Sequence, residues 1–301
     1  MISSPPIRPS RPLSTTPFSV LSCIRFGEVL VLQGSPLLGA LFALDRLMAG
    51  AAGSMALLAA GNCCLVAHVF VVNDWSGIYT DLKDPNRVGS VFVNRGVTRS
   101  SMGLLSLVLL ALGLMLFGAI GLSTMLIASV IAGLSALYSW PRTPMKGVPV
   151  LSSALHFAGG LLHFLLGYSV FSHMDRRGLE IGCFFALLFV AGHLTHETRD
   201  READSVNGIR TNAVAFGKKC SFLAAVTLFG VAGALMVALS LLGRVPPLLI
   251  AVGALFPLHL YWAAKVLRKG LDFESVAWLQ RRYRLLYAAV GILMAVALFR
   301  K

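Results

Sequence analysis

The chain has 301 residues, of which 56% are hydrophobic and only 13% are charged. Soluble domains are about one quarter charged, so this composition excludes a water-soluble globule of this size and indicates a protein whose surface faces lipid. The formal net charge of +13 raises the question of a nucleic acid partner, which the positions of the charges answer below.

The first 27 residues are rich in Ser, Thr, Pro and Arg and contain no acidic residue. A transit peptide has this composition, and so does a disordered tail. We interpret residues 1–27 as a flexible cytoplasmic tail, with a transit peptide as the alternative. Residues 28–301 are then predicted to form a single transmembrane domain.

Nine continuous apolar stretches follow the tail. Each is close to the roughly 20 residues that a helix needs to cross a hydrocarbon core about 30 Å thick. They do not alternate as barrel strands must, and helices satisfy their own backbone hydrogen bonds in lipid. We therefore predict an all-α membrane protein, a bundle of about nine transmembrane helices. The stretches lie near residues 29–47, 54–72, 102–121, 123–140, 149–171, 178–195, 220–243, 246–267 and 285–299.

The basic residues are distributed unequally between the two ends of this predicted bundle. Twenty of the 26 Lys and Arg residues fall in segments on the same side as the N-terminus. Because basic loops stay in the cytoplasm, this bias places the N-terminus there. It also explains the net charge, so no nucleic acid partner is expected. The six basic residues on the outer side are Arg46, Arg176, Arg177, Arg244, Arg300 and Lys301.

A first polar loop follows the second apolar stretch and covers roughly residues 73–101. Asn73 and Asp74 close the predicted helix, and Asp81 and Asp84 lie about two turns further on. Alone this signal is weak, because Asp-Pro-Asn is ordinary turn chemistry and Asp84 has the residue type of a helix cap.

A second polar loop, roughly residues 196–219, continues the sixth apolar stretch. Asp200 and Asp204 are four residues apart and share a helix face with Glu197. Like charges at this spacing repel unless a cation lies between them, and clustered carboxylates suit Mg²⁺. The two loops together hold seven of the thirteen acidic residues. The structural alternative is a solvated helix end whose acids pair with Arg199, Arg201 and Arg210.

Taken together, the two loops resemble the aspartate motifs of the UbiA family of intramembrane prenyltransferases, which are nine-helix proteins. The first loop has Asn-Asp followed after six residues by Asp81, and the second has Asp-x-x-x-Asp. The resemblance extends over nearly the whole bundle. Further matching elements are Gly208, Thr211 and Gly217 after the second motif, and Tyr138-Ser-Trp-Pro-Arg142 followed by Lys146, which is similar to a Tyr-x-x-x-Lys/Arg element of the family.

The resemblance implies a magnesium-dependent prenyltransferase that takes a prenyl diphosphate and a small lipophilic or aromatic acceptor, with a quinone precursor as the favoured class. It implies that Mg²⁺ clamps the diphosphate between the loops and that the prenyl tail lies between helices, facing lipid. The implied metal ligands are Asn73, Asp74, Asp81, Glu197, Asp200 and Asp204, whose four aspartates are the expected catalytic residues. The implied substrate contacts are Asn73, Arg87, Tyr138, Arg142, Lys146, Arg199 and Arg210, on the cytoplasmic side.

The first motif departs from the family pattern at one position. Its usual form is Asn-Asp-x-x-Asp-x-x-x-Asp, and the middle acid is Gly77 here. Either the remaining ligands suffice for one Mg²⁺ or this metal site is weakened, with Asp84 as an off-register substitute.

Other polar residues lie inside the predicted helices. Gln33 is a candidate for the acceptor pocket, because buried polar residues in membranes are often functional. His156, His163 and His193 have no shared metal-site spacing, and we interpret them as packing residues hydrogen-bonded across helices. Tyr79 and Tyr138 are candidates to face a carbocation, or interfacial anchors.

Two rival functions are compatible with the acidic loops. The first is a membrane terpene cyclase, in which the prenyl cation closes on itself without an acceptor. The second is a cation transporter with the acidic loops as its mouth. Acidic residues are nearly absent at mid-membrane positions, where an ion path needs them, which disfavours transport.

Overall fold

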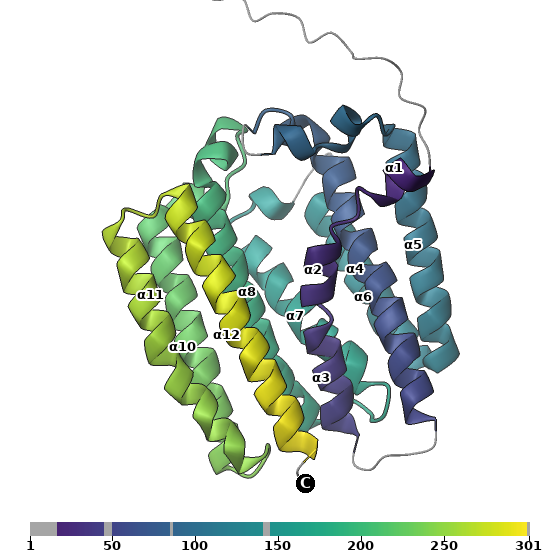
Figure 1. The fold of residues 1–301 in the computed structure, drawn as a ribbon, viewed down its shortest axis with the longest axis vertical. Coiled ribbons are helices and arrows are strands. Elements are labelled where there is room, and N and C mark those ends of the chain that lie inside the picture. The colour runs from purple at the N-terminus through teal and green to yellow at the C-terminus, as the bar shows by residue number, and fades with distance from the viewer. Residues whose placement is uncertain (1–16, 45–49, 85–86, 141–144, 300–301) are drawn as a thin grey trace, which may run out of the picture.

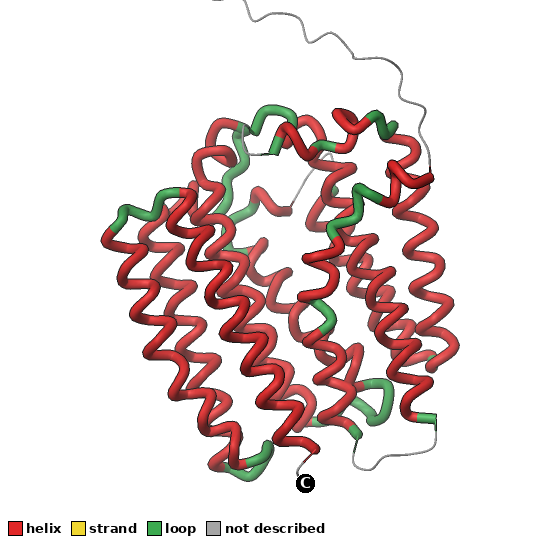
Figure 2. Tube along the Cα trace, in the orientation of Figure 1, coloured by secondary structure: helices red, strands yellow, loops and turns green. Residues whose placement is uncertain are grey.

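A computed structural model of the chain describes residues 17–44, 50–84, 87–140 and 145–299. Within these ranges the regular structure is helical throughout, without strands, and the long helices run side by side in one bundle (Figure 1; Figure 2). Among the described residues, eight segments are long and apolar enough to cross a membrane. The predicted all-α membrane fold is therefore confirmed, and its count of about nine helices is approximate.

The N-terminal part of the bundle begins with a broken crossing. The predicted stretch 29–47 forms two short helices, α2 and α3, with a loop at Leu32–Gln33 between them (Figure 2). The elements of this part are α1 (Pro17–Leu21), α2 (Phe26–Val31), α3 (Gly34–Ala43), α4 (Ala51–Asp81), η1 (Val88–Ser90), η2 (Phe92–Arg95), α5 (Arg99–Ile120), α6 (Leu122–Ser139), η3 (Met145–Gly147) and α7 (Leu151–Tyr168).

The C-terminal part packs against α7 and α3 and completes the bundle. The break predicted between the third and fourth apolar stretches lies at Gly121, between α5 and α6 of the N-terminal part. No comparable break interrupts the long helices α8, α10 and α12 of the C-terminal part. The elements of this part are α8 (Arg176–Val206), α9 (Asn212–Phe216), α10 (Lys218–Leu241), η4 (Pro247–Leu255), α11 (Phe256–Arg268) and α12 (Phe273–Phe299).

Small residues allow the central helices to approach closely. A Cβ atom built on Gly39 of α3 would lie 2.2 Å from the carbonyl oxygen of Phe164 in α7. One built on Gly167 would lie 1.7 Å from the carbonyl oxygen of Pro36. Either side chain would clash with backbone, so α3 and α7 pack at a distance that only glycine permits at these positions.

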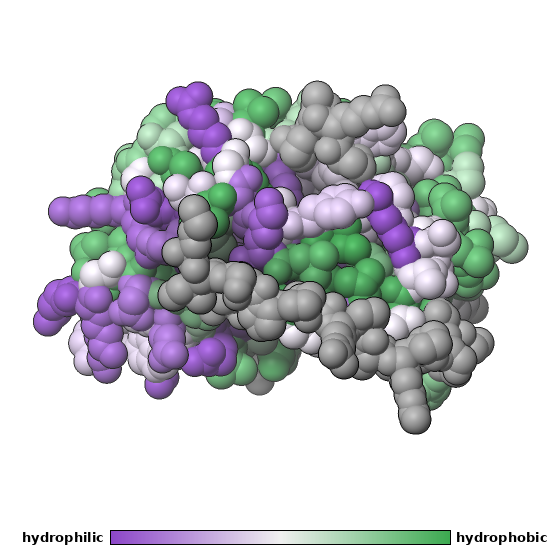
Figure 3. Space-filling model, turned by 90° about the horizontal axis from the view of Figure 1, so that it is seen from above, coloured by the Kyte–Doolittle hydropathy of each residue, from purple (hydrophilic) through white to green (hydrophobic). Residues whose placement is uncertain are grey.

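Helices α4 and α8 are both longer than a membrane crossing requires. Each has 31 residues, or about 46 Å of helix, against the roughly 30 Å of a hydrocarbon core. Their C-terminal turns lie at the same end of the bundle and carry the two acidic motifs (Figure 1). Seen from this end, hydrophilic side chains gather mainly over α10, α11 and α12, and hydrophobic surface shows near the middle (Figure 3).

Candidate active site

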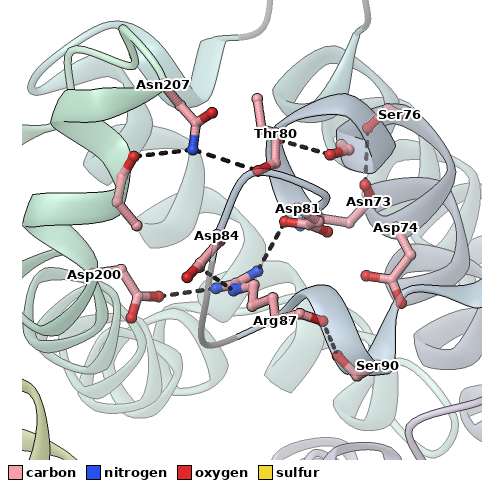
Figure 4. A network of polar contacts seen from close by, with 12 residues as sticks. Asn73, Asp74, Ser76, Thr80, Asp81, Asp84, Arg87, Ser90, Asp200 and Asn207 are labelled. Carbon is pink, nitrogen blue, oxygen red and sulfur yellow. Dashed lines mark hydrogen bonds and ion pairs between the residues drawn. The ribbon is translucent and has the colours of Figure 1, made fainter. Parts of the chain in front are cut away.

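Arg87 lies between the two acidic motifs. Its Nη2 donates to Asp200 Oδ2 at 2.9 Å, and its Nη1 is 3.5 Å from Asp81 Oδ1 (Figure 4). Its Nε is also 3.5 Å from Asp84 Oδ2. The ends of α4 and α8 therefore bring carboxylates within reach of one guanidinium group, although their sequence positions are more than 100 residues apart.

The charges around Arg87 stabilise its cationic form. Burial alone would lower the pKa of Arg87, but the carboxylates of Asp200, Asp81 and Asp84 raise it above its ordinary value. The carboxylate cluster can thus hold a cation, and in this conformation that cation is the guanidinium group of Arg87.

The basic partner of Asp74 is Arg25, which was not among the predicted site residues. The guanidinium of Arg25 pairs with both carboxylate oxygens of Asp74, with an Nε–Oδ2 distance of 3.2 Å. Arg25 belongs to the segment predicted as a tail, of which the structure describes residues 17–27. This part of the segment packs on the domain and neutralises the first aspartate of the motif.

Asp200 is held by its own neighbour on α8. Arg199 donates through Nε to Asp200 Oδ1 at 2.6 Å and through Nη2 to Oδ2 at 2.8 Å. Its Nη1 donates to Gln280 Oε1 of α12 at 2.7 Å, which fixes the orientation of the guanidinium. The predicted phosphate contact Arg199 is therefore committed to Asp200 and α12 in this conformation.

Position 77 faces the site. A Cβ atom built on Gly77 would lie 3.6 Å from Asp81 Oδ2 and 3.8 Å from Lys146 Nζ. Burial lowers the pKa of Lys146, and the charges of Asp81 and Asp204 partly restore it. Where the family pattern has an acid, this chain therefore has a glycine whose Cβ position is in van der Waals contact with the Asp81 carboxylate and lies beside an ammonium group.

Glu197 points into a network of its own. Its Oε2 accepts from the backbone N–H and the side-chain Nδ2 of Asn212, at 3.0 and 2.9 Å. Its Oε1 accepts from Ser152 Oγ at 3.3 Å and is 3.0 Å from His193 Nε2. Asn212 Oδ1 in turn accepts from the N–H of Val150, a residue with φ +66°. The carboxylate of Glu197 thus joins α7, α8 and α9 and holds the strained turn that follows Lys146.

The remaining predicted residues are spread around the site. Asn73 and Tyr138 line a cavity beneath the motifs. Arg210 is exposed, and Arg142 lies outside the described residues. Tyr79 is 67% exposed and stacks under Arg99 at 5.8 Å, so it faces away from this cavity.

The cavity has a volume of about 200 Å³ and walls from the α2–α3 loop at Leu32 and from α4, α6, α7 and α8. Most of its lining is apolar. Near Asn73, the ring of Tyr138 meets the ring of His156 edge-on at 5.0 Å, and His156 stacks on His193 at 3.6 Å. At another point the cavity is lined by His163, seven residues further along α7. An apolar chamber therefore opens beside a charged site.

The donor atoms offered by the motifs suit magnesium. They are carboxylate and amide oxygens, which Mg²⁺ prefers, together with waters and substrate phosphates. Among the described residues no three acidic, His or Cys side chains are already gathered as a metal site.

Comparison with known proteins identifies the fold. The model of the UbiA prenyltransferase family matches residues 34–285. Among proteins with curated functions, none matches this sequence.

Solved structures agree with the family match. A UbiA homologue from Archaeoglobus fulgidus, bound to GPP and Mg²⁺, superposes with a TM-score of 0.73 at 16% identity, over 94% of this chain and 98% of that one. A digeranylgeranylglyceryl phosphate synthase gives 0.69 at 19% identity, over 94% and 99%. The apo UbiA homologue from Aeropyrum pernix K1 gives 0.67 at 15% identity, over 92% and 98%. At these identities the likeness establishes the fold.

Proposed function

The chain thus belongs to the UbiA prenyltransferase family, and on this basis we propose that it transfers a prenyl group from a Mg²⁺-bound prenyl diphosphate to an aromatic or quinone-precursor acceptor within the membrane. The observation that carries the proposal is the meeting of Asp81 and Asp200 at Arg87, beside an apolar cavity. The solved homologues that hold GPP or DMAPP together with Mg²⁺ support it.

The aspartates would hold the metal and, through it, the diphosphate. Asp74 and Asp81 come from α4, and Asp200 and Asp204 from α8, so one diphosphate would be clamped from both sides. Bound Mg²⁺ would neutralise the charge that develops on the leaving diphosphate as the carbon–oxygen bond breaks.

The basic residues would receive the phosphate oxygens. Arg87 and Lys146 lie among the carboxylates, and guanidinium groups bind phosphate with paired hydrogen bonds. With Asp81 and Asp200 holding Mg²⁺, the guanidinium of Arg87 would be free to bind a phosphate oxygen.

The cavity would bring the acceptor to the reacting carbon. Its apolar walls exclude water from a reactive cation, and the aromatic face of Tyr138 would steady the positive charge. After attack, the acceptor loses a proton to an aspartate of the cluster or to the departing diphosphate.

Product identification tests the proposal. Purified protein is incubated with isotope-labelled prenyl diphosphates, Mg²⁺ and a lipid extract, and products are identified by mass spectrometry. We expect a labelled prenyl group joined to an aromatic molecule, only when Mg²⁺ is present. A labelled hydrocarbon with no acceptor would indicate a cyclase instead, and absence of any product would leave transport as the alternative.

The charge bias supports a cytoplasmic active site. Ser90 and Ser205 are exposed and lie in the two polar segments. In a cysteine-free background, a single cysteine at either position should react with a membrane-impermeant reagent only after the membrane is opened. Labelling from outside intact cells would refute this orientation.

A further inference from the structure

A chain of polar groups runs beside the apolar cavity at the level of the break between α2 and α3, and it reaches the cavity at His163. It consists of Gln33 at the break, Asn62 of α4 and His163 of α7. Asn62 is fully buried and His163 is 5% exposed. Buried polar side chains at membrane depth are costly unless each donor and acceptor finds a partner, so the hydrogen bonds of the chain can be followed one by one.

The first link is dictated by a proline. In a continuous helix the carbonyl of Leu32 would accept from the N–H of residue 36, but Pro36 has none. Asn62 Nδ2 supplies the missing hydrogen bond to Leu32 O at 3.3 Å. The same Nδ2 donates to Gln33 Oε1 at 3.0 Å, and Gln33 Nε2 donates to Val29 O at 2.9 Å. The amide of Asn62 can therefore be oriented in only one way.

The second link fixes the histidine tautomer. Because Asn62 Nδ2 is used as the donor, its Oδ1 is the acceptor for His163 Nε2, 2.7 Å away. His163 Nε2 must then carry the proton, which leaves Nδ1 of the neutral ring as a bare acceptor. No described residue donates to this atom, and His163 lines the cavity.

Because Nδ1 of His163 is an acceptor without a donor, it favours some molecules in the cavity over others. A hydrocarbon tail placed against His163 leaves Nδ1 unpaired in an apolar surrounding, which costs free energy. A hydroxyl group placed there donates to it and removes that cost. His163 lies about 10 Å along α7 from His156, which is next to Tyr138 near the aspartates.

We propose that His163 Nδ1 is a recognition site for a hydroxyl group of the acceptor, and that the cavity therefore takes a phenol-type acceptor rather than the prenyl chain. This inference rests on the proposed function, because it takes the bound molecule to be the acceptor. The binding itself needs neither Mg²⁺ nor a prenyl diphosphate. The bound molecule spans the distance from His156 to His163, with its reacting carbon near Tyr138 and a hydroxyl at His163.

Nitrogen NMR of the full chain, labelled with ¹⁵N-histidine in lipid nanodiscs, tests the proposal without turnover. The probes are 1-naphthol, which has a hydroxyl, and 1-methoxynaphthalene and naphthalene, which cannot donate. We expect the His163 ring to show a protonated Nε2 and an unprotonated Nδ1. We also expect 1-naphthol alone to shift the Nδ1 resonance and to bind about fivefold more tightly than the other two.

A matched pair of variants completes the experiment. His163→Leu assigns the resonance and should remove the preference for 1-naphthol while naphthalene still binds. His68→Leu is the control, because His68 is also buried but hydrogen-bonds to Ser106 between α4 and α5, and does not line the cavity. It should leave the preference unchanged.

The wild-type probe series stands even if a variant fails to fold. An Nδ1-protonated His163, equal affinity for the three probes, or a preference that survives His163→Leu would overturn the proposal. These outcomes are independent of prenyl transfer, because a protein that makes no prenylated product can still show the shift, and an active transferase can lack it.

Discussion

The acidic segments at the ends of α4 and α8 lie at the same end of the bundle but are held in different ways. On α8, both oxygens of Asp200 are gripped by the adjacent Arg199. On α4, Asp74 pairs with Arg25, 49 residues away, and Asp81 makes a longer contact of 3.5 Å with Arg87 of its own loop. Asp200 is thus held by its own helix and by Arg87 of the first loop, at 2.9 Å, whereas Asp74 is held by a basic residue far away in the sequence.

This difference also concerns charge. The first motif lacks an acid at Gly77, and Lys146 lies beside the position where that acid would be. The second motif keeps its aspartates and in addition a buried glutamate that serves the framework. We therefore expect the second motif to be the stronger metal-binding half of the site, and the following variants test that expectation.

The largest effect is expected from the second motif. Asp200→Asn and Asp204→Asn should each reduce turnover at least about 100-fold, because each removes a charge that holds the metal and its diphosphate. Initial rates of prenyl transfer measure this loss. Glu202→Gln is the matched control, since Glu202 is on the same helix, is 62% exposed and pairs with Lys218. Wild-type rates in both aspartate variants would refute the assignment.

A substitution of Glu197, also on α8, distinguishes a structural role of this residue from a role in metal binding. Glu197→Leu should lower the free energy of unfolding by about 3 kcal/mol, because it leaves the buried donors of Asn212 and Ser152 without an acceptor. Denaturation in detergent measures this change. Glu197→Gln, which retains an acceptor oxygen, should be less destabilised and should need the same Mg²⁺ concentration as wild type. A raised Mg²⁺ requirement in a stable Glu197→Gln protein would show that Glu197 is a metal ligand.

The smallest effect is expected in the first motif. Gly77→Asp would place a carboxylate beside Asp81 and Lys146, and we expect the Mg²⁺ concentration for half-maximal activity to fall a few-fold. A magnesium titration of both proteins measures it. Loss of activity at every Mg²⁺ concentration would mean that the space beside Gly77 is needed, and an unchanged titration with normal turnover would place position 77 outside the site.

The sequence predicted the features that depend on composition and local spacing. Continuous apolar stretches specify membrane helices, and the four-residue spacing of Asp200 and Asp204 specifies one helix face. The resemblance to the UbiA family was correct, as the match over residues 34–285 shows. These signals depend on residues close together in the sequence, so they can be recognised without the tertiary structure.

The contacts that escaped prediction are long-range. Arg25 lies in a polar segment with no helical periodicity, and nothing near it in sequence indicates Asp74. Glu197 has the spacing of a metal ligand, and that role stays a prediction; its hydrogen bond from the N–H of Asn212 in α9 could not be predicted from the spacing. His163 is hydrogen-bonded across helices as predicted, to Asn62. The state of its other ring nitrogen could not be predicted, because it follows from Pro36 and Asn62, which belong to other helices.

Binding of one magnesium diphosphate by both motifs is the central claim, and calorimetry of geranyl diphosphate binding tests it most directly. Titrations are carried out with and without Mg²⁺ on the wild-type protein, on Asp81→Asn and on Asp200→Asn. We predict binding that requires Mg²⁺ and is weakened by either variant, more strongly by Asp200→Asn. Binding that persists without Mg²⁺, or that is insensitive to a change in one of the two motifs, would contradict the claim.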